Sequence, residues 1–128
     1  MNLFDSSSVI VLCGERRLEV LLDGYTTDLA YYELGNAVWK QVNLYRKISK
    51  TDAEKVLESL YEVFRNLKKI EIGGALETLN IAIKENITYY DASYINAAAK
   101  NNLTLVTEDL QLLKTASRYT KTITSQQL

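Results

Sequence analysis

Short strand-like runs that alternate with helical segments constrain the fold of this chain more than any other feature. The runs are NLF, GYTT, KIEI, TLVT and TIT, and longer segments with helical spacing separate them. Short strands joined through helices imply right-handed βαβ crossovers and a parallel sheet covered on both faces. The sequence therefore predicts an α/β fold with a short-stranded, mainly parallel central sheet.

One predicted helix occupies residues 51–67. Thr51 and Glu54 form a capping-box signature at its start, and its apolar residues recur at the i, i+3, i+4, i+7 spacing. Further helices are predicted at residues 8–13, 16–22, 29–46, 75–84, 90–101 and 110–117, the third of them capped by Asp28. With 128 residues, 47% apolar content and neither linker nor repeat, we expect one domain, residues 1–128.

The first residues carry no pattern typical of a targeting segment. The chain turns polar after Phe4, and its next apolar run is interrupted by Glu15, Arg16 and Arg17. We therefore expect no signal peptide and no membrane-spanning helix, and the cytoplasm is the expected compartment. A single cysteine, Cys13, cannot form an intrachain disulfide and is interpreted as a small core side chain.

The absence of histidine excludes whole classes of chemistry. Without an imidazole, neither Ser-His nor Cys-His nucleophilic catalysis is possible. One cysteine and no histidine also cannot assemble a zinc site of the Cys and His type. Carboxylate chemistry remains, and carboxylate oxygens are hard ligands that favour magnesium, manganese or calcium.

Four acidic residues stand at positions that allow both a structural and a functional interpretation. Asp5, Asp91 and Asp109 each precede or open a predicted helix, so taken singly each is explained as a helix cap. Glu33 lies inside the apolar run LAYYELGNAVW, where an unpaired carboxylate would be costly. Polar residues three and seven positions later share its helix face, so a polar stripe is an equally good explanation of Glu33 alone.

Taken together, the same acids predict a metal site. Asp5 and Asp109 follow strands that we expect to be adjacent and parallel, and ligands bind at the carboxyl ends of such strands. Asp91 opens a neighbouring helix, and Glu33 can reach the same edge from the second crossover. Carboxylates gathered this closely repel one another unless a cation neutralises them. The arrangement therefore predicts a divalent cation.

Four motifs in order carry a resemblance to a known family: FDSSSVI, ELGNAVWK, TYYDASYINAAAK and LVTEDLQL. On these motifs, which span Phe4 to Leu112, the chain resembles a PIN domain, and most closely the toxin ribonucleases of VapBC toxin-antitoxin pairs. The resemblance implies a three-layer α/β/α sandwich. It also implies magnesium- or manganese-dependent endoribonuclease activity on RNA phosphodiester bonds, held in check by an antitoxin protein.

The resemblance also assigns roles to individual residues. It implies that the catalytic, metal-binding acids are Asp5, Glu33, Asp91 and Asp109. It implies supporting roles for Ser7, Asn36, Thr107 and Glu108. Glu108 stands beside Asp109, and either of the two could contribute to the metal site. A bound ion would activate water and stabilise phosphoryl charge, so the mechanism needs no protein nucleophile, in line with the missing histidine.

A net charge of −1 argues against nucleic-acid binding by bulk electrostatics, although local contacts remain open. The candidate RNA contacts are Arg16, Arg17, Lys40, Arg46, Lys47 and Lys50. For all of them a solvated surface is the competing interpretation. Tyrosines flanking two of the acids could stack on unpaired bases, and core packing or a subunit interface is the alternative for these rings: Tyr31, Tyr32, Tyr89, Tyr90 and Tyr94.

The predicted helix at 29–46 is apolar around more than one face, which exceeds what one sheet face can cover. Its apolar residues are Leu29, Tyr32, Leu34, Val38, Trp39 and Val42. We therefore expect a homodimer and a hydrophobic groove for an antitoxin segment. Two alternatives remain: a catalytically silent PIN fold that acts as a binding module, and a receiver-type signalling domain. The receiver type needs an acidic pair after the first strand and a phosphoacceptor aspartate after a buried third strand, whereas Asp5 is followed by three serines and Asp52 follows the polar RKISK.

Overall fold

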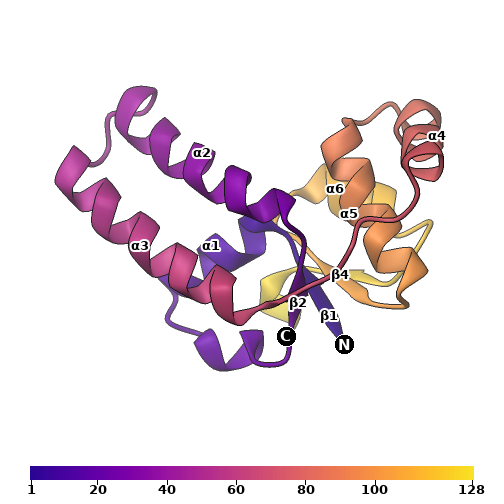
Figure 1. The fold of residues 1–128 in the computed structure, drawn as a ribbon, viewed down its shortest axis with the longest axis horizontal. Helices are drawn as coiled ribbons and strands as arrows, with labels where there is room; N and C mark the ends of the chain where they lie inside the picture. Colours follow the sequence, from indigo (N-terminus) through magenta and orange to yellow (C-terminus); the bar gives the residue numbers. More distant parts are fainter.

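The computed structural model describes all residues, 1–128, and contains one five-stranded sheet with the order β3-β2-β1-β4-β5. Every neighbouring pair of strands is parallel, so the predicted parallel α/β fold is confirmed. The strands are β1 (Asn2–Phe4), β2 (Tyr25–Thr26), β3 (Lys68–Lys69), β4 (Thr104–Val106) and β5 (Thr122–Ile123). They lie at the centre of the molecule in Figure 1.

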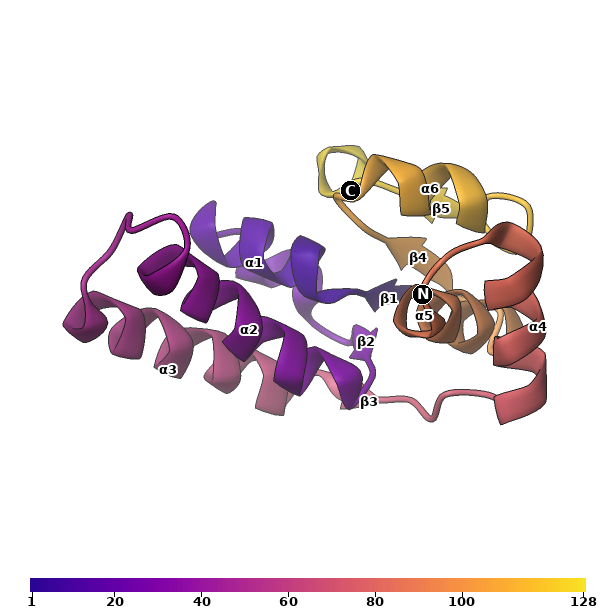
Figure 2. The same cartoon turned by 90° about the horizontal axis from the view of Figure 1, so that it is seen from above.

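Six α-helices and two short 3-10 helices connect and flank the strands. The α-helices are α1 (Ser6–Gly14), α2 (Leu29–Asn43), α3 (Lys50–Asn66), α4 (Ala75–Glu85), α5 (Tyr89–Lys100) and α6 (Leu110–Ala116). The 3-10 helices are η1 (Leu18–Leu21) and η2 (Ser125–Gln127). Figure 2 shows α1, α2 and α3 together on one side of the sheet and α4, α5 and α6 together on the other.

The two faces of the sheet are covered by two separate apolar clusters. Adjacent residues of a strand point to opposite faces, so Phe4 and Val106 face one cluster while Leu3 and Leu105 face the other. The first cluster is completed by side chains of α1, α2 and α3, and the second by side chains of α5 and α6. This division establishes the predicted three-layer α/β/α sandwich.

Two of the predicted helix caps are wrong. Helix α3 begins after Ser49, whose hydroxyl accepts a hydrogen bond from the Asp52 N–H at 3.1 Å, and not after Thr51. The pattern Ser-x-x-Asp offers the same cap two residues before Thr-x-x-Glu, and the apolar spacing fits either start. Asp28 precedes α2, but it has helical backbone angles and its side chain makes no capping hydrogen bond.

Several element boundaries differ from those predicted. Helix α2 ends at Asn43, and the turn that follows contains Arg46 with a φ of 51°, a left-handed conformation that no helix continues through. The segment predicted as a helix at 16–22 is the short 3-10 helix η1. The third strand is Lys68–Lys69, one residue earlier and two residues shorter than predicted.

The topology argues against the receiver-type alternative. Asp52 lies in the first turn of α3, so it does not follow a strand as a phosphoacceptor aspartate would. The strand order instead reverses between β1 and β4, because the chain moves outward from β1 to β3 and then returns to the other side of β1. Such a switch point is where open α/β sheets bind ligands.

None of the helices combines the length and the apolar character needed to cross a bilayer.

Candidate active site

Asp5 lies at the switch point, directly after β1 and before α1. Its side chain is buried, and it caps α1, since Oδ1 accepts a hydrogen bond from the Ser8 N–H at 2.9 Å. The cap interpretation is therefore correct, but it accounts for only part of the environment. Oδ1 also accepts from the Ser7 hydroxyl at 2.7 Å, and Oδ2 accepts from the Thr107 hydroxyl at 2.5 Å. The Asp5 carboxylate is thus held both by Ser7, which follows β1, and by Thr107, which follows β4.

The loop after β4 is built around the same two hydroxyls. Thr107 Oγ1 accepts a hydrogen bond from the Asp109 N–H at 3.1 Å, and Ser7 Oγ accepts one from the Glu108 N–H at 2.9 Å. Asp109 then caps α6, since its Oδ1 accepts from the N–H groups of Gln111 and Leu112. The predicted supporting hydroxyls therefore join the loops that carry Asp5 and Asp109.

Glu33 reaches the site from α2, the helix that follows β2. Its Oε1 accepts hydrogen bonds from the Tyr94 hydroxyl at 2.7 Å and from the Ser6 hydroxyl at 3.2 Å. Burial raises the pKa of Glu33, the two hydroxyls offset part of that rise, and the charges of Asp5 and Asp91 add to it. Glu33 therefore belongs to the same electrostatic group as Asp5 and Asp91, and it is not an isolated polar position on its helix.

Asp91 is the third residue of α5, whose cap is Thr88. The Asp91 N–H donates to the Thr88 hydroxyl at 3.1 Å, so Thr88 is the N-cap and Asp91, which was expected to cap this helix, lies in its first turn. Burial raises the pKa of the Asp91 carboxyl group, and the charges of Asp109 and then Asp5 raise it further. Burial also raises the pKa of Asp5, which its hydrogen bonds from Thr107, Ser7 and Ser8 only partly offset.

The four acids have no basic partner in the protein. None of the salt bridges in the structure involves Asp5, Glu33, Asp91 or Asp109. An all-oxygen donor set with uncompensated charge fits a hard divalent cation in its chemistry. In the arrangement of side chains seen here, however, no three acids are close enough together to form a complete set of metal ligands. The structure thus provides the donors and the charge, without the final chelating geometry.

Two residues of this site were missed by the sequence analysis as hydrogen-bond donors to an acid: Ser6 and Tyr94. Tyr94 is almost fully buried, and its hydroxyl is one of the two groups that hold Glu33. The proximity of Glu33 raises the Tyr94 pKa further, after burial, so this hydroxyl stays protonated and acts as a donor. The available signal was the spacing, because Tyr94 follows Asp91 by three positions and shares its helix face.

Other predicted residues do not join the acids. The Glu108 carboxylate accepts a hydrogen bond from the Ser125 N–H at 2.8 Å, and Asn36 is exposed on α2. Arg17 donates to the Ser125 carbonyl oxygen at 3.2 Å and pairs with Glu15. Arg16 is exposed after the end of α1, and Lys40 is half-buried on α2.

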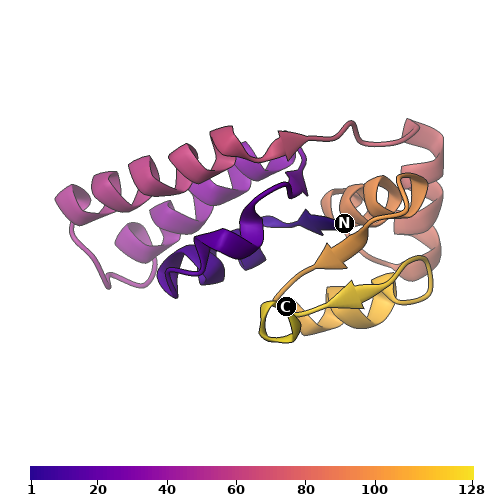
Figure 3. The same ribbon diagram turned by 90° about the horizontal axis from the view of Figure 1, so that it is seen from below.

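The basic cluster Arg46, Lys47 and Lys50 lies at the turn between α2 and α3. Glu33 lies near the beginning of the 15-residue helix α2, which at about 1.5 Å per residue extends roughly 22 Å. Figure 3 shows the helical hairpin of α2 and α3 reaching away from the sheet, with its turn at the far end. These three basic residues are therefore remote from the four acids.

The chain belongs to the PIN domain family, whose profile matches residues 4–118. It is 38% identical over 85 residues to the exonuclease VapC9 of Pyrobaculum aerophilum, a match covering 66% of this chain and 61% of that protein. It is 36% identical over 101 residues to the ribonuclease VapC3 of the same organism, covering 77% of this chain and 76% of that protein. The match therefore spans about three-fifths of the length of VapC9.

Solved structures show the same fold. The crystal structure of PAE2754 from Pyrobaculum aerophilum has a TM-score of 0.84 and 29% identity, covering 98% of this chain and 90% of that one. FitAcB from Neisseria gonorrhoeae has a TM-score of 0.63 and 18% identity, with full coverage of both chains. FitAB bound to a DNA fragment, at 14% identity, has the same TM-score of 0.63. The last two comparisons concern the fold alone.

Proposed function

We propose that residues 1–128 form one nuclease domain, a metal-dependent endoribonuclease that acts as the toxin of a toxin-antitoxin pair. The observation that carries the proposal is the hydrogen bond from Thr107 to Asp5 at the switch point of the sheet. It ties together the two loops whose acids, with Glu33 and Asp91, carry uncompensated charge. The identity with VapC3, a ribonuclease, supports RNA as the substrate.

In this proposal Asp5, Glu33, Asp91 and Asp109 hold Mg²⁺ or Mn²⁺. The ion would supply Lewis-acid chemistry, lowering the pKa of water and stabilising charge on the phosphoryl oxygens. The chain's own contribution is to orient the acids. Ser7 and Thr107 hold the Asp5 carboxylate through their hydroxyls. Ser6 and Tyr94 hold the Glu33 carboxylate in the same way. Buried donors of this kind hold the carboxylates in place before substrate arrives.

A second candidate is exonucleolytic cleavage, which the 38% identity with the exonuclease VapC9 favours. The same acids would serve either activity, so the two candidates differ in where RNA is cut. A circular RNA separates them, because an endonuclease opens it and an exonuclease leaves it intact.

We also propose an antitoxin partner and a homodimer. Of the apolar residues on α2, Leu34 and Val38 are buried in the core, whereas Tyr32 and Trp39 are 71% and 48% exposed. These two lie seven residues apart and therefore share one helix face. An exposed aromatic face is typical of a surface that binds protein. A strictly monomeric mass in light scattering at micromolar concentration would argue against the dimer.

The experiment that tests the nuclease is cleavage of linear and circular RNAs by antitoxin-free protein with Mg²⁺, Mn²⁺ or EDTA. Asp91→Asn should lower the cleavage rate by about 100-fold or more, because it removes one charged donor. Asp23→Asn, a matched change at the opposite edge of the sheet, should leave the rate unchanged. Unchanged cleavage by Asp91→Asn, or full cleavage in EDTA, would contradict the proposal. A folded protein that binds Mn²⁺ but cleaves no RNA would favour the silent binding module.

A further inference from the structure

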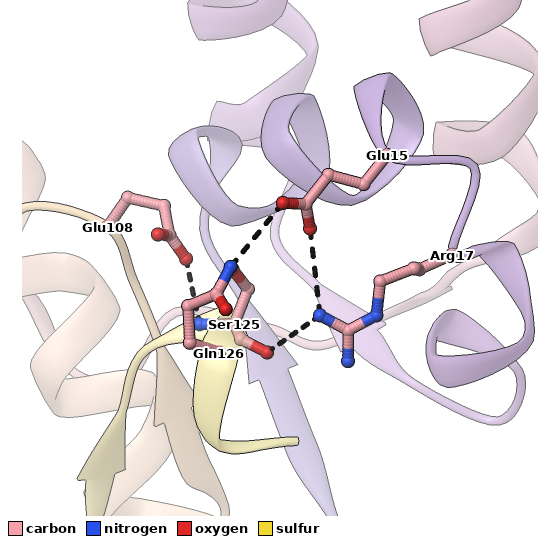
Figure 4. Close-up of polar contacts among 5 residues, drawn as sticks. All are labelled: Glu15, Arg17, Glu108, Ser125 and Gln126. Carbon is pink, nitrogen blue, oxygen red and sulfur yellow. Dashed lines mark hydrogen bonds and ion pairs between the residues drawn. The ribbon is translucent and has the colours of Figure 1, made fainter.

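A polar cluster joins the loop after β4 to η2, the 3-10 helix at Ser125–Gln127. Figure 4 shows Ser125 held from both sides. The Glu108 carboxylate accepts a hydrogen bond from its N–H at 2.8 Å, and its carbonyl oxygen accepts one from Arg17 at 3.2 Å. Arg17 in turn lies 3.6 Å from Glu15, which also accepts a hydrogen bond from Gln126.

Glu108 lies between two residues of the candidate site, yet its side chain turns away from the acids. Thr107 hydrogen-bonds to Asp5, and Asp109 caps α6 beside Asp91, whereas the Glu108 carboxylate is engaged with Ser125. The geometry therefore separates two neighbouring acids that the sequence left as alternatives. The charge of Asp109 acts on Asp91, whereas the Glu108 carboxylate is bound to η2.

The backbone of Glu108 nevertheless remains connected to the site. The Glu108 N–H donates to Ser7 Oγ at 2.9 Å, and the Ser7 hydroxyl donates to Asp5 Oδ1 at 2.7 Å. Three hydrogen bonds thus run from the Ser125 N–H through Glu108 and Ser7 to Asp5. The first is a hydrogen bond to an ionised carboxylate, which is stronger than one between neutral groups.

The loop is held to the C-terminal segment at two points. The Thr107 N–H donates to the Ile123 carbonyl oxygen at 3.1 Å, which continues the pairing of β4 with β5. Two residues beyond Ile123, Ser125 is completely buried and provides the N–H that Glu108 accepts. The side chain of Glu108 thus anchors the part of the loop that lies beyond the strand pairing and carries Asp109.

We propose that Glu108 is a positioning residue, which holds the 107–109 loop against η2 so that Asp5 and Asp109 keep their places without Glu108 contacting metal or RNA. The catalytic consequence of this inference rests on the proposed nuclease function. The effect of Glu108 on the order of the 107–109 loop does not rest on that function, so it can be measured even if the protein does not cleave RNA.

The first test measures hydrogen exchange of the Glu108 and Asp109 amides in the metal-free protein. Glu108→Ala should speed their exchange about tenfold, the equivalent of one hydrogen bond to a charged group, while exchange in the core of α5 stays unchanged. Glu108→Gln should stay close to the unmodified protein, because its amide oxygen can still accept from Ser125. Glu15→Ala, which alters the cluster on the far side of Ser125, is the matched control and should leave these amides protected.

Ser125→Pro reaches the same contact from the other partner and covers the case in which Glu108→Ala does not fold. Proline removes the N–H donor, is tolerated at the first position of a helix, and follows Thr124, whose ψ of 167° suits a residue before proline. Ser125→Pro should speed the hydrogen exchange of the Glu108 and Asp109 amides. Unchanged exchange in both Glu108→Ala and Ser125→Pro would overturn the inference.

The second test compares cleavage rates in Mn²⁺. Glu108→Ala should lower kcat about tenfold with KM for RNA unchanged, and Glu108→Gln should stay within about twofold of the unmodified protein. Equal loss in Glu108→Ala and Glu108→Gln would show that the carboxylate charge itself is needed, and would overturn the positioning role. If the unmodified protein does not cleave RNA, the proposed function fails, and the exchange measurement alone decides the role of Glu108.

Discussion

At the carboxyl edge of the sheet, Asp5, Glu33 and Asp91 have raised pKa values and only hydroxyl or N–H partners within the protein. At the opposite end of the strands, here called the amino edge because β2 and β3 begin there, Asp23 lies 3.8 Å from Lys68 Nζ. Both of these side chains are mostly exposed. One edge gathers like charges in a half-buried setting. The other pairs opposite charges in solvent.

The difference teaches where the molecule departs from what stability alone favours. An exposed ion pair such as Asp23–Lys68 contributes little and costs little. Buried carboxylates that repel one another lower the stability of the folded state, and a cation from outside the chain would restore it. The carboxyl edge is therefore the part of the protein whose charges lower the stability of the folded state, and the amino edge, with its exposed ion pair, serves as the comparison.

The largest expected difference between the two edges is their response to metal. Mn²⁺ at about 100 times its Kd should raise the free energy of unfolding by about 2.7 kcal/mol at pH 7, because it binds the folded state alone. Asp91→Asn should lose most of this gain and Asp23→Asn should keep it, as measured by thermal denaturation with and without Mn²⁺. Equal gains in all three proteins would remove the distinction between the edges.

The buried hydroxyl of Thr107 should affect Mn²⁺ binding, whereas a comparable buried hydroxyl away from the acids should not. Thr107→Val removes the donor to the buried Asp5 carboxylate and should destabilise the protein by about 2 kcal/mol in urea denaturation, with weaker Mn²⁺ binding. Thr78 is equally buried, and its hydroxyl donates to the Gly74 carbonyl oxygen and accepts from the Asn96 side-chain amide. Thr78→Val should also cost about 2 kcal/mol, because it leaves the Asn96 amide unpaired, but it should leave Mn²⁺ binding intact. A loss of Mn²⁺ affinity in both variants would mean that any buried hydroxyl has this effect.

The pH dependence of stability should reflect the carboxyl edge. The pKa values of Asp5, Glu33 and Asp91 are raised in the folded state, so the folded protein binds more protons than the unfolded chain between the two sets of values. The stabilisation of the folded state by this extra proton binding is complete below the unfolded pKa values, and it is lost as pH rises through the folded pKa values. Metal-free protein should therefore become more stable in urea titrations as pH falls towards the unfolded pKa values, which lie near about 4. Asp91→Asn should show a smaller gain, and an equal gain would place the effect elsewhere.

The smallest effect is expected from the ion pair at the amino edge. Asp23→Asn should change the free energy of unfolding by less than about 0.5 kcal/mol, because the carboxylate is exposed and its attraction to Lys68 is screened by water and salt. Chemical denaturation at low and at physiological salt measures this. A cost above 1 kcal/mol would mean that the amino edge also depends on its charges.

Much of this architecture could be predicted because the sequence places acids at the ends of short apolar runs. Asp5 and Asp109 stand after β1 and β4, and the alternation of strands and helices was sufficient to bring these two strands together. The strand limits could not be predicted equally well. A strand of two residues such as Lys68–Lys69 shows no periodicity, and both of its side chains are exposed.

The partners of the acids were harder to predict than the acids themselves. Tyr94 and Glu33 are 61 residues apart, and only the packing of α5 near α2 brings their side chains together. The orientation of Glu108 was likewise hidden, because it depends on Ser125 from the far end of the described chain. Sequence spacing indicates which residues share an element, whereas these contacts depend on how separate elements pack.

The hairpin of α2 and α3 offers a practical consequence. The stacked rings of Tyr31 and Tyr61 and the hydrogen bond from the Tyr61 hydroxyl to the Tyr31 carbonyl oxygen join its two helices near the sheet. Its turn at Leu44–Lys47 is exposed and remote from the acids, and exposed turns tolerate insertion. An affinity tag or fluorophore placed in this turn would allow the protein to be immobilised or followed by microscopy, leaving both chain ends and the acidic edge free.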